Sequence, residues 1–102
     1  MPSPEPENVA QLSTAAVMLS QCLERELVHV TGGRVKPGVK EVYDVVYLPR
    51  LIALSHQASR YVKFDEGQLL CQPLHWDLAD AQLGIVIALL NSLVTALNSR
   101  HP

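Results

Sequence analysis

The chain of 102 residues is poor in aromatic residues, cysteine and charge, and each shortage narrows the kinds of core and surface that it can form. Aromatic side chains make up 5% of it, so the core must consist of Leu, Val, Ile and Ala, which suits packed helices. Cys22 and Cys71 are too few for a disulfide framework, and their apolar neighbours are typical of buried thiols. The charged fraction of 18% is below the roughly 25% of soluble domains. This low fraction indicates that association covers some apolar surface.

The net charge and the first residues set further expectations about partners and location. A formal charge of −2 provides no broad basic field, so we do not expect nucleic acid as a partner. Met1 is followed by prolines and acids rather than by a basic region and an apolar run, as a secretory signal would require. We therefore expect a cytoplasmic protein.

The longest apolar run lies between Asp77 and Asn98, and it contains no charge from Ala81 to Ser99. One stripe alternates steps of four and three residues, the spacing of a helix face. This stripe consists of Ala79, Leu83, Val86, Leu90, Leu93 and Leu97. Asp77 is the expected N-cap. Ile87, Leu89 and Val94 widen the stripe, so most sides of this helix must be covered, by the same chain or by a second copy.

The same stretch approaches the roughly 20 apolar residues of a membrane span. Five polar residues interrupt it, namely Gln82, Asn91, Ser92, Thr95 and Asn98, and no basic cluster or aromatic belt anchors both ends. We therefore do not expect a membrane span.

The N-terminal part divides into a tail and a long helix. Alternating prolines predict that residues 1–8 are a disordered tail, although Asn8 can cap the helix that follows. Apolar residues at helical spacing predict a first helix over 9–30, with Ser13 on its polar side, and Gly32 and Gly33 end it. Residues 9–102 form one helical domain by the usual size of domains.

For two segments in the middle of the chain, the sequence does not decide the type of secondary structure. Residues 39–48 have strand propensity, yet Val39, Val42 and Val46 fit one helix face, and we favour a helix that Pro49 kinks or restarts. Helical spacing continues to about Val62. Residues 68–76 form either an extended strap across the helices or a brief strand. The predicted fold is all-α, a three- or four-helix bundle with the C-terminal helix at its centre. The alternative is an α+β fold with a short strand at 39–48 or 68–72.

The sequence contains no specific motif for catalysis or metal binding. The cysteines and histidines form no close pair of the kind that structural zinc sites use, so we expect no metal and no cofactor. Glu41 and Asp44 have the spacing of paired metal ligands, but a second acidic pair is missing. Cys22 with His29 and Cys71 with His75 are the candidate nucleophile and base pairs, and neither has an oxyanion-hole signature.

The excess of apolar helix surface favours a non-enzymatic protein that acts through self-association and through binding another protein. We expect a homo-oligomer, and a dimer is the favoured form. The candidate interface residues are Leu83, Gly84, Ile87, Ala88, Asn91 and Val94. Small residues there permit close helix contact, and Asn91 can bond across a seam.

Two other functions remain open. The first is a small enzyme or ligand-binding bundle with a pocket near the predicted strap. Its candidate lining residues are Tyr43, Tyr47, Tyr61, His75 and Trp76. The second is a DNA-associated regulator, which would use Arg50, Arg60 and Lys63.

Overall fold

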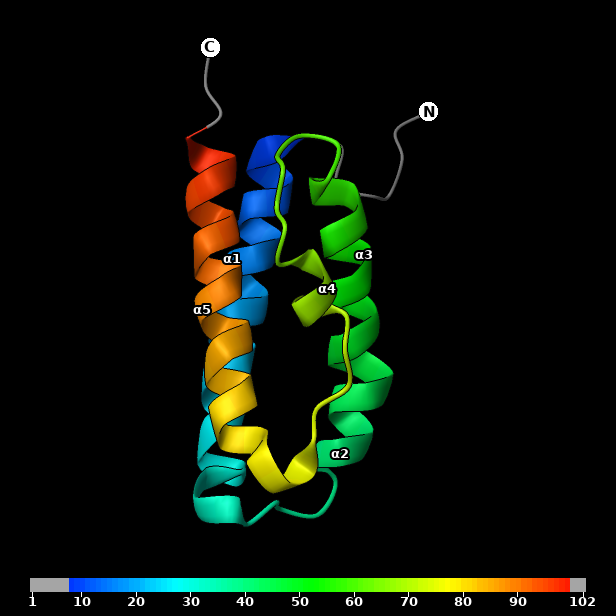
Figure 1. The fold of residues 1–102 in the computed structure, drawn as a ribbon, viewed down its shortest axis with the longest axis vertical. Coiled ribbons are helices and arrows are strands. Elements are labelled where there is room, and N and C mark those ends of the chain that lie inside the picture. Colours follow the sequence, from blue (N-terminus) through cyan, green and yellow to red (C-terminus); the bar gives the residue numbers. More distant parts are fainter. Residues whose placement is uncertain (1–7, 100–102) are drawn as a thin grey trace.

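The computed structural model describes residues 8–99, and within them every regular element is helical. The three main helices are α1 (Val9–Glu26), α3 (Leu48–Ala58) and α5 (Ala79–Asn98). They stand side by side along the long axis of the molecule, with α1 antiparallel to the other two (Figure 1). The all-α bundle is therefore confirmed, and the α+β alternative is wrong for the described residues. The predicted tail lies outside these residues, except for Asn8.

Helix α1 begins and ends at local signals that the sequence contains. The Asn8 side chain accepts a hydrogen bond of 2.9 Å from the backbone N–H of Gln11, as an N-cap does. The helix ends at Glu26, before the predicted Val30, and tightens into the 3₁₀ turns η1 (Leu27–His29) and η2 (Thr31–Gly33). Gly32 has a φ of 71°, a conformation that favours glycine.

The ambiguous segment at 39–48 is helical and contains an unusual turn. Helix α2 (Val39–Val42) leads into the π-helical turn η3 (Tyr43–Tyr47), which passes directly into α3. Pro49 has no N–H to donate and its ring crowds the preceding turn, so a widened turn accommodates it without breaking the helix. The apolar face of Val39, Val42 and Val46 is only partly buried. Val39 is buried and Val46 half-buried, but Val42 is exposed, and the Tyr43 ring is buried beside them.

The return from α3 to α5 is the strap that the sequence predicted, but it is partly helical. It descends between α3 and α5 and contains α4 (Gly67–Leu70) halfway and the 3₁₀ turn η4 (Trp76–Leu78) at its end (Figure 1). At Gly67 a Cβ atom would lie 2.7 Å from the Ser55 hydroxyl oxygen, so glycine allows α4 to approach α3 closely.

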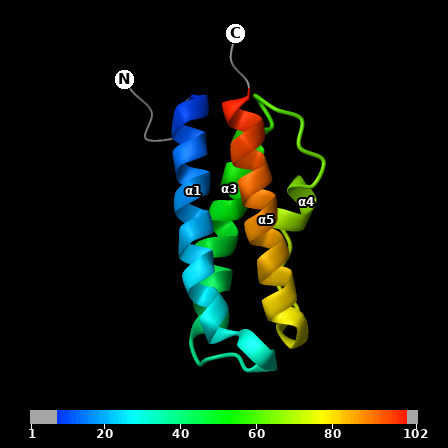
Figure 2. The ribbon, with the colours of Figure 1, turned by 90° about the vertical axis from the view of Figure 1, so that its left-hand side faces the viewer.

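Helix α5 contributes more residues to the core than any other described helix, as its apolar stripe predicted. All six stripe residues and Ile87 are buried. The helix packs extensively against α1, with α3 behind the pair and α4 at the other side (Figure 2). Asp77 is not its N-cap, since it lies within η4 and Leu78 holds the N-cap position without a side-chain hydrogen bond. The Gln82 side chain accepts a hydrogen bond from the backbone N–H of His75. Residues 76–98 have the length and apolar composition of a membrane span.

Candidate functional site

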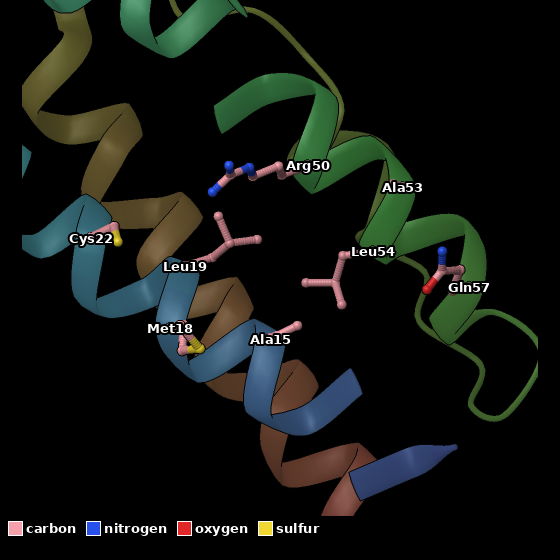
Figure 3. Close-up of a pocket in the computed structure, with 8 residues that line it drawn as sticks. All are labelled: Ala15, Met18, Leu19, Cys22, Arg50, Ala53, Leu54 and Gln57. Atoms are coloured by element: carbon pink, nitrogen blue, oxygen red, sulfur yellow. The ribbon is translucent and has the colours of Figure 1, made fainter. Parts of the chain in front are cut away.

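An apolar groove lies between α1 and α3, and we call it the α1–α3 groove. Its volume is about 290 Å³, close to the lower limit of typical ligand pockets. Eight residues line it: Ala15, Met18, Leu19 and Cys22 from α1, and Arg50, Ala53, Leu54 and Gln57 from α3 (Figure 3). Each helix contributes residues at i, i+3, i+4 and i+7, which lie on one face over two turns, so the groove runs along the helices for about 10 Å.

The floor and walls of the groove have different chemistry. Leu19 and Leu54 are buried and form the floor. Met18 stands at the α1 wall with 60% of its side chain exposed, whereas Ala15 is small. Because α1 and α3 are antiparallel, Cys22 lies at the same end of the groove as Arg50, and Ala15 lies at the end marked by Gln57 (Figure 3). The groove is therefore apolar along its length and polar at both ends of its α3 wall.

A polar cluster lies beside the Arg50 end of the groove. The Tyr47 hydroxyl donates a hydrogen bond of 3.2 Å to Oε2 of Glu26, which ties the start of α3 to the end of α1. Partial burial raises the pKa of the Tyr47 hydroxyl, and the charge and hydrogen bond of Glu26 raise it further, while Arg50 opposes this shift. The charges of Glu26 and Arg50 therefore act on the Tyr47 hydroxyl in opposite directions.

The structure brings together three of the five predicted pocket residues. The Tyr43 ring meets Trp76 edge-on, with centroids 6.0 Å apart, and the Tyr47 ring at 6.3 Å. Lys40 Nζ lies 5.9 Å from the centroid of Trp76. Tyr61 lies beyond the other end of α3, and His75 is exposed. None of the five lines the α1–α3 groove.

Tyr43 is the most deeply buried of these aromatic residues. Only 2% of it is exposed, and its hydroxyl has no hydrogen-bond partner among the described residues. Burial raises the pKa of Tyr43 to about 12, with a smaller contribution from the charge of Asp44. The packed rings are typical of a structural core, whereas a buried hydroxyl without a partner is uncommon in one.

The six candidate interface residues of α5 do not share one surface. Leu83 and Ile87 are buried in the core, and Val94 is half-buried. Ala88 is exposed, and a Cβ atom at Gly84 would meet nothing within 4 Å.

Asn91 is engaged within the chain, in a contact that we call the α1–α5 seam. Its Oδ1 accepts a hydrogen bond of 3.0 Å from the Ser20 hydroxyl, and Asn98 Oδ1 accepts one of 3.0 Å from Ser13. Both serines are buried in the seam, so placing Ser13 on the polar side of α1 was wrong.

The structure places Cys71 near a different histidine from the one with which the sequence paired it. Cys71 lines an open hollow of about 470 Å³ between α3 and α4, together with His56 and Asp65 rather than with His75. No hydrogen bond links Cys71 with His56 among residues 8–99. In the same part of the chain no three His, Cys, Asp or Glu side chains lie together as a metal site would require.

The residues proposed for DNA binding do not form a compact patch. Arg50 lies in the first turn of α3, at the groove, whereas Arg60 and Lys63 follow the last turn of that helix. Nine residues of mostly helical chain, 51–59, separate Arg50 from Arg60. The basic groups therefore lie at opposite ends of α3.

No known protein family, curated protein or solved structure matches this chain.

Proposed function

We propose that the protein acts without catalysis, by associating with another helical surface through the α1–α3 groove, and that this association includes a homodimer. The supporting observation is the open apolar groove between two helices that lie side by side for two turns. A groove of this form accepts the apolar face of a helix, with anchors at i, i+3 or i+4, and i+7.

Two features of the groove favour an associating surface over an active site. It is apolar along its length between Arg50 and Gln57, and Cys22 is the single residue of nucleophilic type among those that line it. Exposed Met18 offers a long flexible side chain, the type that adapts to helical partners. Association would also cover apolar surface that water now contacts, which favours binding.

The test is the mass of the protein in solution, measured by sedimentation equilibrium between about 1 and 100 μM. Wild type is expected to dimerise in this range, and Met18→Asp is expected to weaken dimerisation at least tenfold, because a carboxylate would be desolvated in the groove. Val45→Asp is the matched control, since Val45 is 73% exposed and does not line the groove, and it should dimerise as wild type does.

Gly84→Ala tests the competing surface on α5. The added methyl group has room in the monomer, so dimerisation should be unchanged if the groove is the interface. A wild-type protein that stays monomeric at 100 μM would contradict the homodimer. Equal dimerisation of Met18→Asp and wild type would contradict the role of the groove.

A further inference from the structure

The helical segment of residues 39–58 is enclosed less completely than the α1–α5 seam. It consists of α2, η3 and α3, and we call it the α2–α3 arm. Arg50 and Gln57 line the groove of about 290 Å³, whereas Ser55 and Ser59 line the hollow of about 470 Å³ beside α4. By the rotation of a helix, these two pairs lie on nearly opposite sides of α3. Open space therefore flanks the buried stripe of α3 on both sides, where side chains lack packing partners.

The α2–α3 arm also contains a buried polar group that nothing compensates. The Tyr43 hydroxyl, in the π-helical turn η3, has no hydrogen-bond partner among the described residues. The seam differs, because the hydroxyls of its buried residues Ser13 and Ser20 are hydrogen-bonded. Water would hydrate the Tyr43 hydroxyl if the arm moved away from the core. Detaching the arm therefore recovers free energy that detaching α1 from α5 does not.

The order of the elements allows the arm to move while the seam stays closed. Helices α1 and α5 are the first and last described helices, and they pack directly against each other (Figure 2). The arm belongs to the connection between them, so its departure does not require the two helices to separate. It is bounded by residues 34–38 and 59–66, which are turns and loops without helix or strand. These two segments can act as hinges.

We infer that the α2–α3 arm opens as a unit about these hinges while the α1–α5 seam remains closed. The hydrogen bond of 3.2 Å from the Tyr47 hydroxyl to Glu26 joins the arm to α1 and acts as its latch. Opening uncovers the buried residues Leu51, Leu54 and Ala58 of α3. The arm is therefore a conformational device that controls when this apolar surface becomes accessible, and it does so whether or not the protein dimerises.

Amide hydrogen exchange of the monomeric protein, followed by mass spectrometry, tests this inference. In the wild type, the amides of residues 48–58 should exchange at least about tenfold faster than those of residues 83–93, because opening the arm requires less free energy than global unfolding. Asn91→Ala removes a bond of the seam, which only global unfolding breaks. It should therefore speed exchange in residues 83–93 about fivefold and leave exchange in residues 48–58 unchanged.

Two variants within the arm give a second readout. Tyr47→Phe removes the latch and should speed exchange in residues 48–58 about fivefold, whereas Tyr43→Phe removes the unpartnered hydroxyl and should slow it about fivefold. Equal exchange of the two segments in the wild type, or faster exchange of the arm in Asn91→Ala, would overturn the inference, because the bundle would then open as one unit. Unchanged exchange of the arm in Tyr47→Phe would overturn the role of the latch.

Discussion

Helix α1 makes two contacts that differ in how completely they are closed. Towards α5 it forms the seam, in which Ser13 and Ser20 bond to Asn98 and Asn91. The residue numbers of each pair add to the same value, 111, so both bonds fit one antiparallel register. Towards α3 the two helices leave a groove of about 290 Å³, and Tyr47 bonds to Glu26 beside one end of it.

The difference shows how a small bundle can separate stability from association. The seam buries leucines and provides partners for buried hydroxyl groups, so it fixes the fold. The groove keeps apolar atoms in contact with water, which costs free energy in the monomer and becomes favourable on association. Substitutions in the seam should therefore affect unfolding, and substitutions on the groove wall should affect association.

The largest expected effect is the loss of a buried leucine from α5. Leu90→Ala should lower the free energy of unfolding by about 3–4 kcal/mol, because it leaves a closed cavity beside a fully buried position. Leu54→Ala, at the floor of the groove, should cost only about 2 kcal/mol, since the vacated space opens to the groove. Urea denaturation at low protein concentration measures both, and equal losses would contradict the contrast between a closed seam and an open groove.

Alkaline pH should lower the stability of the fold through Tyr43, which lies on the α2–α3 side of the molecule. The seam should not contribute, because its serine hydroxyl and asparagine amide groups do not titrate in this range. The Tyr43 hydroxyl ionises near pH 10 in the unfolded chain, but its folded pKa is about 12. Between these values the unfolded chain holds fewer protons, so stability falls as pH rises, by about 2–3 kcal/mol.

Tyr43→Phe is the control for this pH dependence. It removes a buried hydroxyl that has no partner among the described residues, so it should be neutral or stabilising by about 1 kcal/mol at pH 7. Urea denaturation of both proteins from pH 9 to 12 should show a flatter pH dependence in the variant. Identical slopes would show that Tyr43 does not cause the fall.

In the seam, removing the acceptor of a hydrogen bond should lower the free energy of unfolding more than removing the donor. Asn91→Ala should cost about 1–2 kcal/mol, because it leaves the Ser20 hydroxyl, 3% exposed, without this acceptor. Ser20→Ala should cost about 0.5–1 kcal/mol, since exposed Asn91 can bond to water instead. Thermal unfolding of the two variants, with Ser92→Ala as an exposed control, tests the order, and a reversed order would contradict it.

The helical core could be predicted from the sequence, because burial follows a simple spacing along α1, α3 and α5. The stripe from Ala79 to Leu97 is a direct example, since all six residues are buried. The turn at Tyr43–Tyr47 could not be predicted, because β-branched residues and Pro49 favour competing conformations and only tertiary packing decides between them.

The candidate site was harder to predict because it depends on how two helices lie side by side. Ala15, Met18 and Cys22 share one face of α1, and a search for an apolar or small stripe beside the core stripe could have found them. Their position opposite Arg50 and Gln57 depends on the register of α1 and α3, which spacing within one helix does not contain. The bonds of Ser13 and Ser20 were missed for the same reason.

A dilution series followed by methyl NMR tests the central contrast most directly. The ε-methyl signal of Met18 should shift with protein concentration between about 1 and 500 μM. The methyl signals of Leu90 in the core and of Ile85, an exposed residue of α5, should not shift. That result would show an open groove that associates beside a seam that is already closed. A constant Met18 signal together with a shifting Ile85 signal would contradict the account.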